Sequence, residues 1–169
     1  MTAAHTPNRL ERQLDRLSDL PAFARTFFRG VVMHRAVPFT GTAGLDFLLM
    51  TPGKVEIGLK NEKKVQNHIG GIHASAMNLL AETATGMVVG MNVRDDCTPL
   101  AKELKMAFKK RATGALRATA TLSDEQRALM QGSDKGEVTV PVTVTDELGV
   151  NPVECEFVWA WIPSGPRKS

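Results

Sequence analysis

Residues 67–91 decide the fold of this chain and read NHIGGIHASAMNLLAETATGMVVGM. The first seven residues have the chemistry of a loop, because asparagine and glycine favour turns. A run of helix formers follows, and from Ala74 to Val93 the only ionisable side chain is Glu82. A helix that is apolar on nearly all sides is buried on nearly all sides. A carboxylate inside it costs several kcal/mol unless it is paired, hydrogen-bonded or useful. The sequence therefore predicts a buried helix with one costly group in its middle.

The length of this run, about 20 residues, would suffice for a membrane span. It contains several polar side chains, namely Ser75, Asn78, Glu82, Thr83 and Thr85. Such residues are rare in spans that face lipid. We therefore expect a core helix wrapped by a sheet and no membrane span.

The composition is that of one globular domain of 169 residues, with 43% hydrophobic and 23% charged residues. A net charge of +3 suits an anionic ligand and is too small to indicate nucleic-acid binding. Cys97 and Cys155 have neither metal-type spacing nor the pattern of a disulfide framework. No Gly-rich phosphate loop or other cofactor motif is found, so we expect no cofactor and no metal. Met1 to Leu20 lacks an apolar signal core, and the expected location is the cytoplasm.

The N-terminal part predicts two helices. Residues 8–20 place leucines at i, i+4 and i+7, which indicates an amphipathic helix of about three turns. Pro21 suits the first turn of a second helix. Its apolar side would consist of Phe23, Phe27, Phe28, Val31 and Val32. We expect both helices to cover a sheet edge or an apolar groove, or to form a lid over a ligand tunnel.

Two strands are predicted before the buried helix and four after it. Alternation from Leu45 to Leu59, interrupted by Pro52-Gly53, indicates a hairpin. After a polar break at 94–99, alternation marks strands at 104–108, 116–122, 138–144 and 153–161. Ser123 and Gln126 have the spacing of a helix capping box. Pro141 indicates an edge position or a bulge. The connections after the buried helix are mostly short enough for antiparallel hairpins.

The predicted fold class is α+β, with an antiparallel six-stranded sheet wrapped around one long buried helix and two N-terminal covering helices. The corresponding division of the chain is an N-terminal helical extension at 1–35, the main domain at 36–163 and a loose tail at 164–169.

The stretch around the helix start also resembles a known signature. Asn67, Gly70, His73 with two small residues after it, and Glu82 match the motif of phenylacetate-pathway-type acyl-CoA thioesterases. These enzymes belong to the hotdog superfamily. The rest of the chain, roughly residues 40–162, looks more like an uncharacterised hotdog branch that is sometimes fused to acetyltransferases. The resemblance implies the hotdog fold, hydrolysis of an acyl-CoA thioester, and a homodimer or dimer of dimers. Where related thioesterases usually have His-Gly-Gly this chain has His-Ala-Ser, and many have Asp in place of Glu82.

The start of the buried helix offers free N–H groups and a positive dipole end to a thioester carbonyl. By resemblance the oxyanion donor is the N–H of Ala74. Asn67 would hold the attacking water or the carbonyl, and Glu82 would act as general base or nucleophile. His73 would orient the loop, which is also what an ordinary hydrogen-bonded histidine at a helix start does. A structural or surface role is expected for His68. The alternative for Glu82 is a buried carboxylate paired with a neighbour.

Helix geometry predicts that the site is shared between two chains. Glu82 lies nine residues beyond His73, which is ~13 Å along a helix and about half a turn out of phase. Two such helices packed antiparallel would bring each Glu82 to the partner's helix start. We interpret Gly86 and Gly90 as the small residues that let the two helices approach closely.

Between Lys102 and Arg117 there are six Lys or Arg against one Glu. Within this segment Lys109, Lys110 and Arg111 are expected to end a strand at a turn. They form either a solvated hairpin end or an anchor for the phosphates of coenzyme A.

Two other functions remain open besides hydrolysis. A non-catalytic module that binds acyl-CoA or an acyl carrier is consistent with the His-Ala-Ser departure. A hotdog dehydratase or hydratase is disfavoured, because its His-Phe-Pro motif and the Pro-Gly pair that follows are missing. The acyl group itself does not follow from the sequence.

Overall fold

The computed structural model describes residues 6–17 and 19–165 and has an α+β architecture. The helices are α1 (Arg9–Asp15), α2 (Ala22–Ala36), α3 (Pro38–Ala43), α4 (Ala74–Gly90) and α5 (Asp124–Gly132), with a single 3-10 turn at Lys63–Val65. The strands are β1 (Leu45–Thr51), β2 (Lys54–Leu59), β3 (Cys97–Phe108), β4 (Leu116–Thr121), β5 (Gly136–Val140), β6 (Val142–Asp146) and β7 (Val153–Pro163).

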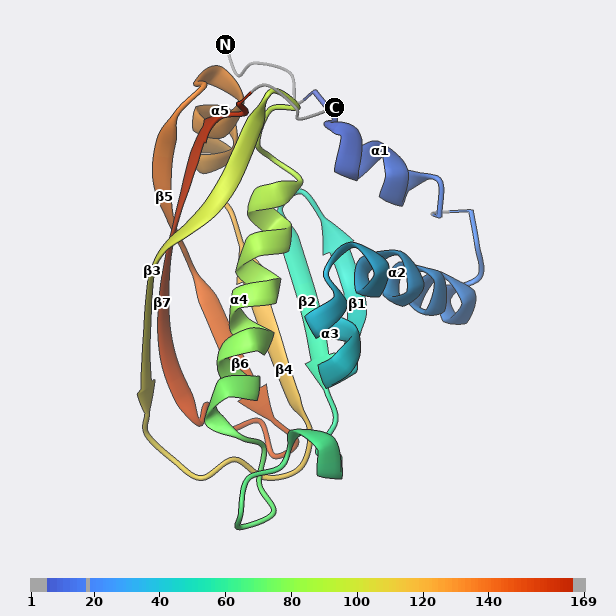
Figure 1. Ribbon diagram of the computed structural model, residues 1–169, viewed down its shortest axis with the longest axis vertical. Coiled ribbons are helices and arrows are strands. Elements are labelled where there is room, and N and C mark those ends of the chain that lie inside the picture. The colour runs from blue at the N-terminus through green and yellow to red at the C-terminus, as the bar shows by residue number, and fades with distance from the viewer. Residues whose placement is uncertain (1–5, 18, 166–169) are drawn as a thin grey trace.

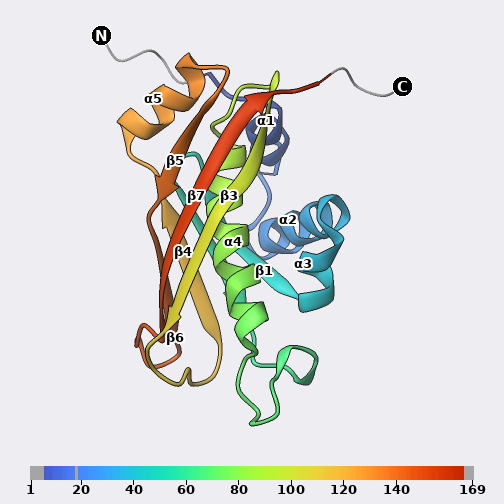
Figure 2. The same cartoon turned by 60° about the vertical axis from the view of Figure 1, so that its left-hand side comes forward.

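The strands form two antiparallel sheets that curve around α4, as Figures 1 and 2 show. One is four-stranded in the order β1-β2-β4-β6, and the other is three-stranded in the order β3-β7-β5. The prediction of a single six-stranded sheet is therefore wrong, because the described residues form seven strands that are divided between two sheets. In the described residues β1 and β2 are the only consecutive strands that pair as a hairpin. The other pairs join non-consecutive strands within one sheet, as β2–β4, β4–β6, β3–β7 and β5–β7.

Pro141 explains part of this difference. The alternation predicted as one strand at 138–144 is cut there into β5 and β6, which belong to different sheets. Proline has no backbone N–H to donate to a neighbouring strand. The chain can therefore change sheets at this residue without leaving an N–H group unpaired. The predicted polar break at 94–99 is also too long, because β3 already begins at Cys97. The predicted capping box is confirmed, with the Ser123 and Gln126 side chains each accepting from the other's backbone N–H.

The predicted core helix is confirmed as α4. Its fully buried residues include Leu80, Ala81, Ala84 and Val88, and the helix contacts strands of both sheets. The indole N–H of Trp159 on β7 donates to the Thr85 hydroxyl at 3.0 Å. Its interior position lets α4 hold the two sheets together.

Gly86 and Gly90 have close neighbours within this chain, and their predicted contact with a second helix stays a prediction. A Cβ on Gly86 would lie 2.7 Å from the Trp159 ring, and one on Gly90 would lie 3.4 Å from Leu10. Both glycines therefore permit close packing within this chain.

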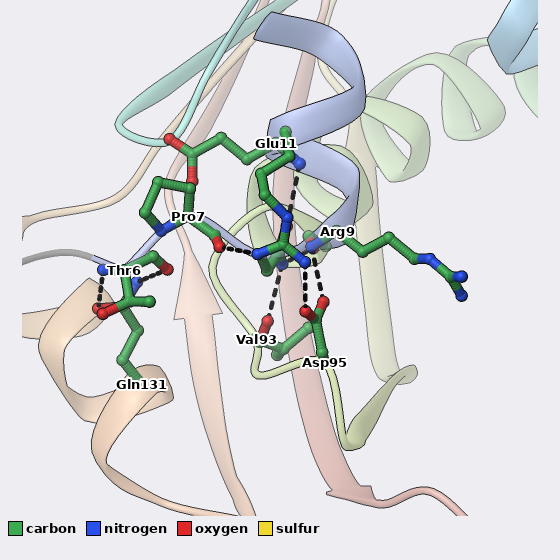
Figure 3. A network of polar contacts seen from close by, with 10 residues as sticks. Thr6, Pro7, Arg9, Glu11, Val93, Asp95 and Gln131 are labelled. Atoms are coloured by element: carbon green, nitrogen blue, oxygen red, sulfur yellow. Dashed lines mark hydrogen bonds and ion pairs between the residues drawn. The ribbon is translucent and has the colours of Figure 1, made fainter.

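The N-terminal helix α1 is tied to the far end of α4 (Figure 3). It is shorter than the predicted segment 8–20, in which Ser18 lies outside the described residues. The Asn8 side chain caps α1 by accepting from Glu11 N–H, and its Nδ2 donates to the carbonyls of Gly90 and Val93, at 2.7 Å each. Arg12 forms an ion pair with Asp95 at 2.8 Å. These contacts fix α1 on the loop that joins α4 to β3.

Helix α2 covers the edge strand β1, as one of the predicted alternatives has it. The His34 ring lies 2.9 Å from the carbonyl oxygen of Leu45, and Arg29 donates to that of Leu48 at 3.4 Å. Covering an edge in this way protects it from pairing with other chains. The covering face is not the apolar one: Phe23, Phe27 and Val31 are exposed, with Phe23 at 82%. The short helix α3, with Pro38 in its first turn, was not predicted.

No helix in the described part of the chain is long and apolar enough to cross a membrane. Of the predicted tail at 164–169, residues 166–169 lie outside the described residues.

Candidate active site

A groove of about 490 Å³ runs along the open side of α4, between α3 and the C-terminal half of β3. Its walls are mainly apolar, and its lining comprises Phe39, Ala74, Ser75, Asn78, Leu79, Glu82, Met106 and Phe108. The sequence places Ala74, Asn78 and Glu82 at intervals of four, so one helix face forms the floor. Two of the predicted site residues, Ala74 and Glu82, are thus brought to one groove.

Glu82 is the only carboxylate among the groove-lining residues. Its side chain is half-buried, and burial raises its pKa above the usual range. Within the described residues its carboxylate oxygens have no hydrogen bond and no ion pair, so the alternative of a carboxylate paired with a neighbour finds no partner there. A carboxyl group with a raised pKa in a cleft is suited to accept a proton near neutral pH.

The start of α4 is capped by His73. Its Nδ1 accepts the Ser75 N–H at 3.1 Å, and its carbonyl accepts the N–H groups of Ala76 and Met77. The Ala74 N–H comes first in the helix, and no acceptor for it lies among the described residues. His73 itself lines a neighbouring hollow of about 240 Å³, which shares Phe39, Ser75 and Leu79 with the groove. Its hydrogen bonds are those of an N-terminal capping residue.

Asn67 closes the loop before α4. Its Oδ1 accepts the N–H groups of Ile69 and Gly71, at 3.1 Å each, and its own N–H donates to the Gly71 carbonyl at 2.8 Å. Gly70 has φ of +76°, a conformation that other residues rarely adopt. The oxygen of Asn67 is therefore engaged by the loop, and Asn67 is not among the residues that line the groove. His68 in the same loop is exposed.

Ala74 and Glu82 share a groove but not a reaction centre. They are eight residues apart, which corresponds to ~12 Å along the helix axis. A base must lie within hydrogen-bond reach of the water that it activates. Within one chain, Glu82 is therefore too far from the Ala74 N–H to act on the same thioester.

The basic residues follow directly after Phe108, which lines the groove. β3 ends at Phe108 as predicted, and Lys109 forms an ion pair with Glu154 at 3.0 Å. Lys110 and Arg111 are exposed beside it. Among the described residues, no group of His, Cys, Asp and Glu side chains could hold a metal ion.

The sequence did not identify the residues that form the groove walls. Phe39 lies on α3, which has no apolar periodicity, and Phe108 and Met106 were assigned only to an alternating strand. Asn78 lies one helical turn from both Ala74 and Glu82. This spacing could have predicted that Asn78 lies on the same helix face as the two site residues.

This architecture, a long helix wrapped by antiparallel sheets, is the hotdog fold. Residues 25–162 match a family model described as "Domain of unknown function (DUF4442)", and the chain belongs to this family. No curated protein matches the chain.

Solved structures share the fold. A protein of unknown function from Pseudomonas aeruginosa, described as a probable thioesterase, has a TM-score of 0.74 and 24% identity over 86% of this chain and 97% of its own. A thioesterase from Haemophilus influenzae has a TM-score of 0.61 and 12% identity, over 74% and 82% of the two chains. A thioesterase family protein from Silicibacter pomeroyi has a TM-score of 0.62 and 15% identity, over 80% and 96%.

Proposed function

We propose that this protein hydrolyses acyl-CoA thioesters to a free acid and coenzyme A. The observation that carries the proposal is Glu82, a half-buried carboxylate without a partner among the described residues, in a groove that also contains an uncapped helix N–H. The thioesterase names of proteins with the same fold agree with this proposal.

Each part of the reaction has a group to perform it. Glu82, ionised, takes a proton from a water molecule that attacks the thioester carbonyl. The oxygen of that carbonyl becomes an oxyanion, which accepts the Ala74 N–H at the positive end of α4. The carbon–sulfur bond then breaks, protonated Glu82 gives its proton to the leaving sulfur, and coenzyme A leaves as its thiol. The Asn67 Nδ2 would orient the water or the carbonyl, and the apolar walls at Phe39, Leu79 and Met106 would hold the acyl group.

The ~12 Å between Ala74 and Glu82 implies that each site takes its helix start from one chain and its carboxylate from another. Leu104 and Phe108 on β3 are exposed apolar side chains on the same strand face as the groove residue Met106. β3 is also an edge strand of twelve residues, which can pair with another chain. These features support a homodimer with two shared sites.

The nucleotide end of coenzyme A would lie toward Lys109, Lys110 and Arg111, just past the groove wall at Phe108. Lys109 already has Glu154 as a partner. Lys110 and Arg111 are therefore the residues we expect to contact the phosphates.

The test is thiol release from a panel of acyl-CoA esters by a Glu82→Gln variant. This substitution keeps the shape of the side chain and removes the base, so we expect the rate to fall about 10²-fold or more. Glu103→Gln, the same change at an exposed carboxylate on β3, is the matched control and should keep the wild-type rate. An unchanged rate in Glu82→Gln would exclude Glu82 from the mechanism. Binding of acyl-CoA without thiol release by the wild type would indicate the binding module.

A further inference from the structure

Helix α2 carries two neighbouring arginines, one of which contacts β1, and no carboxylate. Arg25 and Arg29 are one helical turn apart, and Arg29 is only 8% exposed. From Pro21 to Ala43 the sequence contains no aspartate or glutamate. Two positive charges are thus held together in a part of the chain that supplies no negative charge of its own.

The contacts of both guanidinium groups are to neutral carbonyl oxygens. Arg29 donates from Nη1 to Leu48 at 3.4 Å, while its Nε is buried without an acceptor. Arg25 donates from Nε and Nη2 to the carbonyl of Leu20, at 3.3 and 3.2 Å. Neither arginine forms an ion pair within the described residues. Burial, and then the charge of Arg25, lower the pKa of Arg29.

Other arginines of the chain are arranged differently. Ion pairs join Arg12 to Asp95, Arg94 to Asp96, Arg117 to Glu56 and Arg127 to Asp124. Those pairs lie at or near the surface, where water would also stabilise an isolated charge. Among the arginines without an ion pair in the described residues, Arg29 is buried, and burial is where lack of a counter-charge is most unfavourable. Its like-charged neighbour one turn away adds repulsion.

We propose that Arg25 and Arg29 form a binding site for a phosphate group, either free phosphate or a phosphate of coenzyme A. A guanidinium group presents a planar fork of N–H donors that matches phosphate oxygens. Two forks separated by one turn, ~6 Å along the helix, both reach a single tetrahedral dianion. The anion would accept hydrogen bonds from the guanidinium groups of both arginines and neutralise both charges.

The experiment is a titration with inorganic phosphate, followed by calorimetry and by thermal unfolding, against chloride at equal ionic strength. The wild type should bind phosphate saturably and gain melting temperature. Arg29→Met keeps the apolar stem and removes the charge, and should weaken phosphate binding by about 10- to 100-fold. Arg35→Met removes an exposed charge from the same helix and should bind as the wild type does.

Absence of a phosphate-specific effect in the wild type, or equal binding by Arg29→Met and wild type, would overturn the site. Because Arg29→Met deletes an unpaired charge, we expect it to fold. Arg25→Gln provides a second variant in which phosphate binding should also weaken.

Competition identifies the source of the phosphate. If the group belongs to coenzyme A, then coenzyme A displaces inorganic phosphate from the wild type, and Arg29→Met loses affinity for coenzyme A. If coenzyme A does not compete, the ligand is free phosphate. Only the first source rests on the proposed function. Glu82→Gln should bind phosphate normally in either case, so failure of the thioesterase proposal would leave this test intact.

Discussion

Two carboxylates of this protein, Glu82 in the groove and Asp146 at the end of β6, have opposite surroundings. Asp146 accepts three backbone N–H groups, from Thr113, Leu148 and Val150, at 2.9 to 3.0 Å. These bonds lower its pKa, with the Val150 N–H contributing most. Glu82 accepts none within the described residues, and burial raises its pKa.

The difference separates a carboxylate that stabilises a fold from one that is available for chemistry. Asp146 ties the loop before β4 to the turn between β6 and β7, and all of its bonds favour its ionised form. Glu82 sits on α4, which is rigid and buried on its other faces, so its position is fixed by the helix rather than by its own contacts. Substitutions at or near the two residues should therefore affect different measurements.

The largest effect should come from removing the proposed oxyanion donor beside Glu82. Ala74→Pro deletes one N–H at the first helical position, where proline is well tolerated. His73 already has the extended conformation that a following proline requires. We expect kcat to fall about 10²- to 10³-fold with little change in melting temperature.

Asp124→Pro, at the first position of α5, is the matched control and should retain activity. Full activity in Ala74→Pro would show that this N–H is not the oxyanion donor, and the mechanism would then lack a donor to act together with Glu82.

Mixing two inactive variants tests whether Glu82 serves the partner's helix start. In a heterodimer of Ala74→Pro and Glu82→Gln, one shared site carries both lesions and the other carries neither. Random pairing makes about half of the dimers mixed, so about a quarter of the wild-type activity should return in a symmetric dimer. A site confined to one chain gives no recovery. Exchange of subunits is confirmed with mass-tagged chains, and absence of recovery after exchange would contradict the shared site.

Much of the fold could be predicted because residues that point into the core recur at a regular spacing in the sequence, every second residue in a strand and every three to four in a helix. The alternation at Val55 and Ile57 and the apolar run of α4 gave the β1–β2 hairpin and the central helix. The division into two sheets could not be predicted, because alternation continues across Pro141 and does not say which strands pair. Pairing of β3 with β7 joins residues far apart in the chain, and local patterns carry no information on it.

The sequence predicted the reactive groups of the candidate site but not the residues that form the walls of its groove. Glu82 was visible as the single charge of an apolar run, and Ala74 followed from the motif. The groove wall at Phe39 depends on how α3 packs beside α4, which no local pattern shows. The exposed apolar side of α2 was recognised as apolar, but whether it faces the core or solvent is decided by packing.

A smaller effect, on stability and not on catalysis, is expected for Asp146→Asn. The amide keeps one acceptor but turns a donor toward the Thr113 N–H, so the melting temperature should fall at neutral pH. Because the pKa of Asp146 is lowered in the fold, its stabilisation is present above its unfolded pKa and is lost as the pH falls through the folded value. The difference from wild type should therefore shrink below about pH 4. Thiol release per folded molecule should stay unchanged, in contrast to Glu82→Gln.

The smallest effect concerns the stability of Glu82→Gln and has the opposite sign. Because the pKa of Glu82 is raised in the fold, protonation favours the folded state. That stabilisation is complete below the unfolded pKa, about 4.3, and is lost as the pH rises through the folded value. The glutamine variant does not ionise, so its melting temperature should match that of the wild type near pH 4 and exceed it by about 2 °C or less at pH 8. A variant that is instead less stable than wild type at pH 8 would mean that the ionised carboxylate is stabilised in the native protein. Glu82 would then resemble Asp146, and the contrast between the two carboxylates would not hold.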